Sequence, residues 1–514
     1  MECFKTFELS FQGNAPAGSQ TAVDVTAEFT NDSEHISVKG FYDGNGVYKV
    51  RFLPRKEGVW HWEVTGAVSA RGSEVCTRSG EYHGLVQAEG THFTFEDGTR
   101  YLPFGTTVYA LAHQTDGVIA DTFETLKSAP FNKVRMCVFP KYYDLVKSEP
   151  PLFPFEQDAS GKWDVNRPNF AFWHRLERCI DALEDLGIQT DLILFHPYDR
   201  WGFSKMTMEE NLAYLDLVIR RLAARPNLWW SLANEYDLLP ARTLEDWYAI
   251  ETYISQHDPY RHLLSCHNCT AAYDFHRPNV THVSIQTSWI ERVLAWQREY
   301  RKPVIYDEMC YEGNVIFDWG NISGFELTHR FWAVCSSGGF ATHGDTFMDE
   351  NDIIWWACGG KLKGQSAPRI GFLKELLYHL PGPLEPMDQR GIAHFEQLDE
   401  QWLLSLKEQD EGLYQMASGI LRMDPGLRQA MFTKGTSYGG HCGEDAYLMY
   451  YGRTCPYKAD LQLPGDKTYS IQVIDIWEMT KTTVLTGVNG AVEVPLPSKE
   501  GIAVLAERSD CYGW

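Results

Sequence analysis

The segment Leu228-Trp229-Trp230-Ser231-Leu232-Ala233-Asn234-Glu235 decides the fold expected for this chain. Its short apolar run is typical of a buried parallel strand, and the run ends on an amide and a carboxylate. Pro303-Val304-Ile305-Tyr306-Asp307-Glu308 repeats this arrangement, and loop-like sequence follows each segment. In barrels of alternating strands and helices, functional side chains gather where the strands end. The two segments therefore predict such a barrel, with Glu235 and Glu308 at its mouth.

Similar apolar runs recur through the middle of the chain and alternate with amphipathic segments. The expected strands cover residues 101–109, 133–139, 189–196, 228–234, 262–266, 282–286, 303–308 and 339–343. The expected helices include residues 173–186, 209–224, 244–255 and 327–336. This alternation is typical of an α/β fold, a closed (β/α)8 TIM barrel. An open, doubly wound sheet is the alternative, although no G-x-G-x-x-G or phosphate loop supports a nucleotide-binding version.

The sequence on either side of this α/β region has the pattern of antiparallel β structure. Before it, Phe7, Leu9 and Phe11 alternate with other residues, and Asp43-Gly44-Asn45-Gly46 is a turn signal. After the helix breaker Pro381-Gly382-Pro383, strand-like runs return at residues 402–406, 446–451, 469–476, 482–485 and 502–506. We therefore expect an N-terminal β-sandwich over residues 1–88, the barrel over 89–385 and a C-terminal antiparallel β domain over 386–514.

The composition narrows the class of partner. The formal net charge is −23 in 514 residues, which disfavours nucleic acid and anionic membrane surfaces and suits a neutral substrate. No run of about twenty apolar residues predicts a membrane span. The segment from Met1 to Glu8 lacks the apolar stretch of a signal peptide, so we expect a cytoplasmic protein. The sequence leaves the oligomeric state open, and a homo-oligomer remains compatible with it.

The cysteines and histidines raise the question of a metal. Twelve cysteines are spread along the chain, which suggests reduced thiols, and the C-x-x-C pair of Cys266 and Cys269 lacks the second pair of a structural zinc site. A metal-dependent barrel hydrolase is nevertheless an alternative. Its ligands would be His196, His267, His343 and Asp345. The absence of a His-x-His pair after the first strand weakens it, and we expect no metal and no cofactor.

Two carboxylates at one barrel mouth can hydrolyse a glycosidic bond, so the expected substrate is a carbohydrate. If Glu235 ends the fourth strand and Glu308 the seventh, their carboxyl groups face each other at about 5 Å, the geometry of the retaining mechanism. Glu308 is then the nucleophile and Glu235 the acid and base, protonated because its charged neighbour raises its pKa. The amide of Asn234 is expected to bind the sugar hydroxyl next to the reacting carbon.

Further polar and aromatic residues near the predicted strand ends are candidates for binding the substrate. Arg135 lies within the second strand, where a buried arginine needs a carboxylate partner such as the nucleophile or forms an ordinary ion pair. The polar candidates at strand ends are His196, Gln286, His343 and Asp345. The candidates for stacking on a sugar ring are Tyr109, Trp201, Trp289, Trp355 and Trp356, of which we expect two to serve and the others to pack.

At these residues the chain resembles the retaining glycoside hydrolases of the (β/α)8 clan A, whose acid/base follows strand four and whose nucleophile follows strand seven. The segment Thr342-His343-Gly344-Asp345, with Trp355-Trp356, is similar to the last barrel segment of the apiosidase-like group. Residues 41–52 resemble the β-sandwich that precedes the barrel in many bacterial glycoside hydrolases, and the C-terminal part is similar to the β domain that follows it.

The resemblance implies a cofactor-free retaining glycosidase that removes a terminal sugar from a plant- or bacterial-type oligosaccharide or glycoside by double displacement. It leaves the sugar open. One departure concerns the aromatic residue that often contacts the nucleophile from strand six, because Gln286 stands near that place. The hydrogen bond to the nucleophile must then come from elsewhere. A non-catalytic carbohydrate-binding protein on the same scaffold is the remaining alternative.

Overall fold

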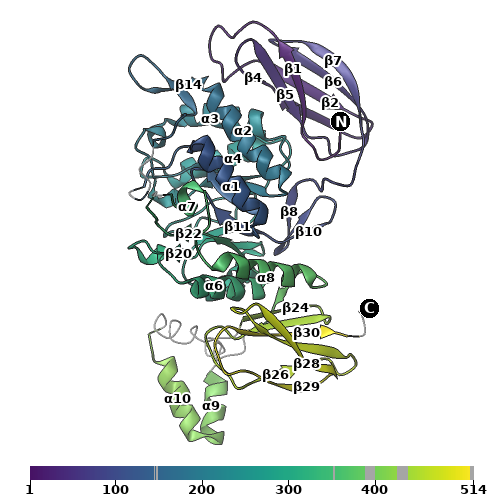
Figure 1. The fold of residues 1–514 in the computed structure, drawn as a ribbon, viewed down its shortest axis with the longest axis vertical. Helices are drawn as coiled ribbons and strands as arrows, with labels where there is room; N and C mark the ends of the chain where they lie inside the picture. Colours follow the sequence, from purple (N-terminus) through teal and green to yellow (C-terminus); the bar gives the residue numbers. More distant parts are fainter. Residues whose placement is uncertain (144, 146–148, 351–352, 388–399, 425–437, 510–514) are drawn as a thin grey trace. The chain divides into compact units, whose positions relative to one another are not determined.

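The computed structural model describes residues 1–143, 145, 149–350, 353–387, 400–424 and 438–509 (Figure 1). The chain forms two compact units. The first contains residues 1–288, 296–323 and 340–367, and the second contains residues 289–295, 324–339 and 368–514. We describe each unit by itself. The domain boundaries expected at residues 88 and 385 stay predictions.

The first unit contains a sheet of eight parallel strands in the order β17-β16-β15-β12-β11-β21-β19-β18. Their bounds are β11 Phe104–Thr107, β12 Lys133–Cys137, β15 Gln189–Phe195, β16 Leu228–Ala233, β17 Leu264–Ser265, β18 Val283–Gln286, β19 Val304–Glu308 and β21 Phe340–His343. A parallel bridge between His267 and Ser284 joins the two ends of this order. The sheet therefore closes into the expected barrel, and the open-sheet alternative is wrong.

The helices of the first unit begin where the sequence supplies caps. Helix α2 (Phe170–Asp185) follows Asn169, whose side chain accepts hydrogen bonds from backbone amides of the first turn. Helices α3 (Met208–Leu222) and α4 (Leu244–His257) begin with capping boxes, Thr207 with Glu210 and Thr243 with Asp246. These three helices lie where the apolar periodicity predicts them. Helix α1 (Asp116–Ser128) follows β11.

The N-terminal part of the first unit consists mainly of two antiparallel sheets. Strands β1 (Phe7–Gln12), β5 (Val47–Phe52) and β4 (Phe41–Tyr42) form one, and β3 (His35–Lys39), β2 (Val25–Thr30), β6 (Gly58–Gly66) and β7 (Ala70–Cys76) form the other. The rings of Phe29 and Phe52 stack between them with centroids 4.0 Å apart.

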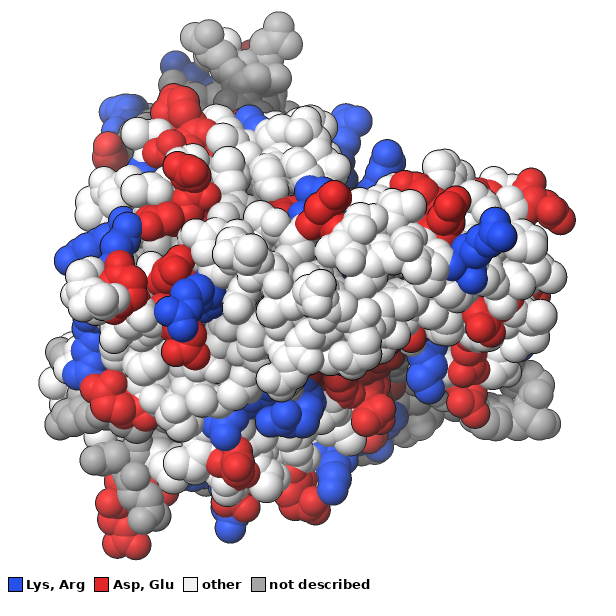
Figure 2. Space-filling model, turned by 90° about the horizontal axis from the view of Figure 1, so that it is seen from above, with Lys and Arg blue, Asp and Glu red and all other residues white. Residues whose placement is uncertain are grey.

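On the face shown in Figure 2, acidic and basic side chains are interspersed among uncharged ones.

A buried ion-pair network ties the N-terminal sheets to the barrel helices. Arg221 of α3 pairs with Glu177 of α2 at 2.7 Å and with Asp43 at 2.8 Å. Arg51 of β5 pairs with the same Glu177 at 2.8 Å. Burial alone would raise the pKa of Glu177, but the charges of Arg221 and Arg51 hold it well below its ordinary value. The network therefore links residues far apart in the sequence through charges that solvent does not screen.

Replacing Arg221 by methionine should lower the free energy of unfolding by about 3–5 kcal/mol, because it removes the cation that Glu177 and Asp43 share and breaks a buried ion-pair network. Urea denaturation followed by circular dichroism measures this loss. The matched control is Arg178→Met on the exposed side of α2, which should change stability by no more than about 0.5 kcal/mol. Equal unfolding midpoints for both variants would show that the network contributes little.

The second unit contains most of the C-terminal β structure. Its larger antiparallel sheet comprises β23 (Glu385–Pro386), β24 (Tyr438–Cys442), β25 (Ala446–Tyr450), β30 (Ile502–Arg508), β27 (Tyr469–Asp475) and β28 (Thr480–Val488). Strands β26 (Lys458–Gln462) and β29 (Ala491–Pro495) form a smaller sheet. Tyr469, Ile471 and Val504 of the larger sheet lie in a buried hydrophobic cluster of this unit. Four of the five strands predicted here are present.

The fifth prediction in this region is wrong, because residues 402–406 lie within helix α9 (Glu400–Gln409). The segment is rich in leucine, glutamate, glutamine and lysine, which favour helix, and this outweighs the short apolar run that suggested a strand. Helix α10 (Glu411–Leu421) follows directly and is capped by Asp410. Among the residues that the structure describes, no helix is both long and apolar enough to cross a membrane.

Candidate active site

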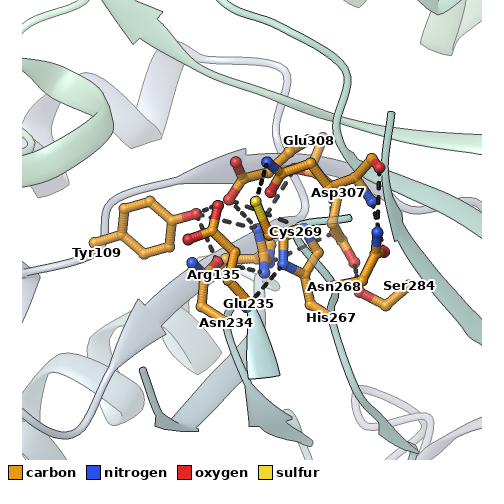
Figure 3. A network of polar contacts seen from close by, with 12 residues as sticks. Tyr109, Arg135, Asn234, Glu235, His267, Asn268, Cys269, Ser284, Asp307 and Glu308 are labelled. Carbon is orange, nitrogen blue, oxygen red and sulfur yellow. Dashed lines mark hydrogen bonds and ion pairs between the residues drawn. The ribbon is translucent and has the colours of Figure 1, made fainter. Parts of the chain in front are cut away.

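The barrel brings Glu235 and Glu308 into one cluster of polar side chains (Figure 3). Glu308 is the last residue of β19, and Glu235 follows β16 by two positions. The side chains are largely buried, since Glu235 is 5% and Glu308 8% exposed. Glu235 has a left-handed backbone with φ of 54°, which is uncommon for a residue with a side chain and is often found at functional positions. Its amide donates a hydrogen bond to His267 Nδ1 at 3.4 Å, which helps to fix this turn.

The electrostatic surroundings of Glu235 favour its protonated form. Burial and then the charge of Glu308 raise its pKa, while the charge of Lys141 and hydrogen bonds with Tyr198 and Gln286 oppose this. Its Oε2 atom is buried and accepts no hydrogen bond within the described part of the chain. Glu235 is therefore suited to carry a proton and give it to a bound ligand.

Glu308 is held by Tyr109, which follows the first barrel strand. The Tyr109 hydroxyl lies within hydrogen-bond distance of Glu308 Oε1 and, at 2.9 Å, of Asn234 Oδ1. Its ring is fully buried, so it does not offer the accessible stacking face expected from the sequence. The hydroxyl instead supplies the hydrogen bond to Glu308. The sequence left the donor of this bond open, because Gln286 stands near the place where the resemblance led us to expect an aromatic residue.

Arg135 lies beneath the two glutamates and contacts several members of the cluster. Its Nη1 is 3.5 Å from Glu308 Oε1, and its Nη2 donates to Asn234 Oδ1 at 3.3 Å. Its Nε is also 3.7 Å from a carboxylate oxygen of each of Asp191 and Asp307. Both sequence interpretations of Arg135 therefore hold, because the guanidinium contacts Glu308 and also takes part in a buried ion-pair group.

Asp307 completes this group, although no role was expected for it from the sequence. It accepts hydrogen bonds from Lys133 at 2.7 Å, Ser284 at 2.6 Å and Thr342 at 2.7 Å. Burial raises its pKa, but the charges of Lys133 and Arg135 outweigh this and leave the pKa well below its ordinary value. Asp307 is thus a fixed negative charge that orients the cations below Glu308.

Gln286 also reaches the cluster. Its backbone amide donates to Asn268 Oδ1 at 3.1 Å, and the Asn268 side chain donates back to its carbonyl at 3.4 Å. This pairing fixes the ends of β17 and β18 beside each other. The side chain of Gln286 is close enough to Glu235 to act against the rise in the pKa of that carboxyl group.

The other predicted polar residues have partners outside the cluster. His196 Nε2 contacts the carbonyl of Phe139 at 3.2 Å, and His343 Nδ1 contacts the Thr106 hydroxyl at 3.1 Å. Burial lowers the pKa of His196 to about 4 and that of His343 to about 3. Asp345 accepts hydrogen bonds from three backbone amides, including Lys363 at 2.6 Å and Gly364 at 2.7 Å. It therefore anchors a loop, contrary to the substrate contact expected of it.

The metal alternative depends on these same histidines. His267 lies in the glutamate cluster, whereas His196 and His343 face other elements. Burial, followed by the charge of Arg135, lowers the pKa of His267 well below its ordinary value. In the ranges that the structure describes, no three histidine, cysteine or acidic side chains are grouped to hold a metal ion. The alternative therefore has no supporting site there.

The tryptophans proposed for stacking lie in different surroundings. Trp355 is fully buried and donates to Thr106 Oγ1 at 2.8 Å, so its expected role in stacking on sugar is wrong. Trp356 is also buried, packed edge-on against Tyr109. Trp201 is half-buried and donates to Glu149 at 3.1 Å, whereas Trp289 is 63% exposed. Only the last two keep a ring face that a ligand can reach.

Replacing Tyr109 by phenylalanine should lower kcat/KM by about 10- to 100-fold, since it removes one hydrogen bond to a charged group. Steady-state kinetics on a hydrolysed glycoside measures the effect. Tyr214→Phe is the matched control, because Tyr214 is equally buried but donates to the Leu194 carbonyl at 3.1 Å, away from the glutamates. If both variants kept wild-type kcat/KM, the Tyr109 hydroxyl would have no part in the reaction.

Comparison with known proteins agrees with this architecture. The family described as "Apiosidase-like, catalytic domain" matches residues 87–381, and two domains of unknown function, DUF5060 and DUF5605, match residues 1–67 and 436–506. A "putative glycoside hydrolase" from Bacteroides vulgatus ATCC 8482 is 33% identical over 99% of both chains, with a TM-score of 0.84. A glycoside hydrolase family 5 structure from the same organism shares the fold at 15% identity, covering 84% of this chain and 94% of its own, with a TM-score of 0.59.

Among curated proteins, no sequence matches. The barrel and these likenesses define the protein as a glycoside hydrolase, an enzyme with a carbohydrate substrate. More particularly, the chain belongs to the family with an apiosidase-like catalytic domain.

Proposed function

We propose that the protein is a retaining glycosidase that cleaves a terminal sugar from a plant- or bacterial-type oligosaccharide or glycoside by double displacement. The observation that carries this proposal is the convergence of Glu235, whose pKa is raised, with Glu308, which Tyr109 and Arg135 hold in place. A carboxylic acid beside a carboxylate at one barrel mouth is the equipment of this reaction. The separation of about 5 Å that retention requires stays a prediction.

In the first step, Glu308 attacks the anomeric carbon and forms a glycosyl ester, while Glu235 protonates the departing oxygen. In the second step, Glu235 removes a proton from water, the water oxygen attacks the same carbon, and Glu308 leaves as a carboxylate. The change of role follows from the charges. Once Glu308 is esterified its negative charge is gone, so a main cause of the raised pKa of Glu235 disappears and Glu235 ionises.

In this mechanism Asn234 assists both steps. Its Oδ1 faces the donors Tyr109 and Arg135, so its Nδ2 points the other way. That nitrogen is buried and has no acceptor within the described residues. A sugar hydroxyl beside the anomeric carbon would supply the acceptor, and this bond would strengthen as charge develops in the transition state.

A panel of 4-nitrophenyl glycosides, both pyranosides and furanosides, tests the proposal. Release of nitrophenol from at least one of them, at a rate that scales with enzyme concentration, supports a glycosidase that removes a terminal sugar. Binding of free sugars without hydrolysis of any of these glycosides would favour the non-catalytic carbohydrate-binding protein instead.

A further inference from the structure

Lys141 is a buried cation beside the two glutamates that the proposed mechanism does not use. It lies in the loop after β12, and the residue is only 8% exposed. Its ammonium nitrogen lies 3.3 Å from the ring centre of Tyr109, 4.4 Å from that of Tyr198 and 5.0 Å from that of Trp356. Cation–π attraction to these rings stabilises the charge.

The ammonium nevertheless keeps its hydrogen-bonding capacity. A lysine ammonium has three N–H donors, and ring faces are poor substitutes for oxygen acceptors. Within the ranges that the structure describes, Lys141 forms no hydrogen bond and no ion pair. Its nitrogen is largely buried but not sealed off from solvent, so these donors stay open to an acceptor from outside the protein. An oxygen from a bound ligand can supply that acceptor.

The position of Lys141 indicates where such an oxygen would come from. Two of the rings around it belong to Tyr109, whose hydroxyl is hydrogen-bonded to Glu308, and to Tyr198, whose pKa is raised by burial and then by the nearby Glu235. A ligand bound between the two carboxyl groups would therefore lie next to the ammonium. Sequence spacing did not predict this, because Lys141 lies in a loop whose path the strand pattern does not define.

The charges around Lys141 indicate a neutral ligand. The positive charges of Lys133 and Arg135 are balanced by two carboxylates, those of Asp191 and Asp307. The charge of Lys141 is therefore left to balance that of Glu308. Glu235 favours its neutral form. The remaining titratable neighbours that interact with Lys141, in addition to the tyrosines, are Cys137, His196 and His267, and burial favours the neutral form of each. The pocket thus has no surplus positive charge to select an anion.

We propose that Lys141 binds the substrate, donating hydrogen bonds to a hydroxyl or ring oxygen of an uncharged sugar at the cleaved bond. This inference rests on the proposed glycosidase function and adds to it a residue that determines affinity. Lys141 is 3.3 Å from the Tyr109 ring centre and is surrounded by aromatic rings, so its side chain has little freedom to turn away from the site. Its contribution should therefore be to ground-state binding as well as to the transition state.

The test compares Lys141→Met and Lys141→Arg with the wild type on the nitrophenyl glycoside that the panel identifies. Each enzyme is assayed at its own pH optimum. We expect Lys141→Met to raise KM by about tenfold or more, with a smaller change in kcat, since uniform binding is lost. Lys141→Arg keeps the charge but displaces the donors, so KM should rise while the pH profile stays in place. Lys127→Met, at an exposed lysine of α1 paired with Glu124, is the matched control and should keep the wild-type KM.

A purely electrostatic role gives a different result. Lys141→Met would then move the alkaline limb of the pH profile to higher pH, because the charge that lowers the pKa of Glu235 is gone, while KM stayed within twofold of wild type. That outcome would overturn the inference. So would a result in which Lys141→Met and Lys141→Arg both keep the wild-type KM. Failure here is distinct from failure of the proposed function, which would appear as retained activity in Glu308→Gln.

Discussion

Glu308→Gln should lower kcat by roughly ten-thousandfold or more, because an amide cannot form the glycosyl ester on which both steps depend. The amide keeps the size of the side chain and can still accept a hydrogen bond from Tyr109, so the fold should persist. Steady-state assays with the hydrolysed nitrophenyl glycoside measure the loss, and circular dichroism checks the fold.

The matched control for Glu308→Gln is Glu299→Gln, the same change at a half-exposed glutamate of α5 (Val293–Tyr300). It should keep wild-type kcat and KM, as surface substitutions away from a site usually do. A Glu308→Gln enzyme with kcat within tenfold of wild type would remove Glu308 from the role of nucleophile.

Glu235→Gln should lower kcat by about 100- to 10,000-fold, the range that general acid–base catalysis contributes. A nitrophenolate leaving group needs little protonation, so the glycosyl enzyme should still form and then accumulate for want of a base. Azide needs no base to attack it. Added azide should therefore restore turnover and yield a glycosyl azide of the same anomeric configuration as the substrate.

Two comparisons make the Glu235 experiment specific. Glu308→Gln should not respond to azide in this way, because it forms no glycosyl enzyme. In the wild type, kcat/KM should fall as pH rises through the raised pKa of Glu235, since the acid must be protonated, and Glu235→Gln should lack this limb. A Glu235→Gln enzyme that azide leaves unchanged, or an azide product of the opposite configuration, would contradict the assignment.

The barrel could be predicted from sequence because buried parallel strands leave a strong local signal. Glu235 and Glu308 were found for the same reason, since Glu308 ends one such strand and Glu235 follows another by two positions. Successive side chains of a strand point to opposite faces, however, and the exact register decides which residue near a strand end reaches the centre. His343 and Trp355 both contact Thr106, and sequence proximity to a strand end could not reveal this.

The residues that sequence reasoning missed depend on contacts across the barrel. Tyr109 was recognised as an aromatic residue, but its hydrogen bond to Glu308 joins positions 199 residues apart. Lys141 lies in a loop, where no periodic pattern indicates direction. Helix α9 was misread because a short apolar run fits either a strand or a helix, and intrinsic helix propensity decided between them. Pattern thus predicts elements, whereas tertiary contacts determine the roles of side chains.

Trapping the covalent intermediate tests the central claim most directly. A 2-deoxy-2-fluoro derivative of the hydrolysed sugar, carrying a good leaving group, slows both steps by destabilising their positively charged transition states and lets the glycosyl enzyme accumulate. Proteolysis and mass spectrometry should then find one sugar on the peptide that contains Glu308, attached to that residue. A sugar attached to a different residue, or an enzyme that forms no adduct and releases its first product with inverted configuration, would contradict the account.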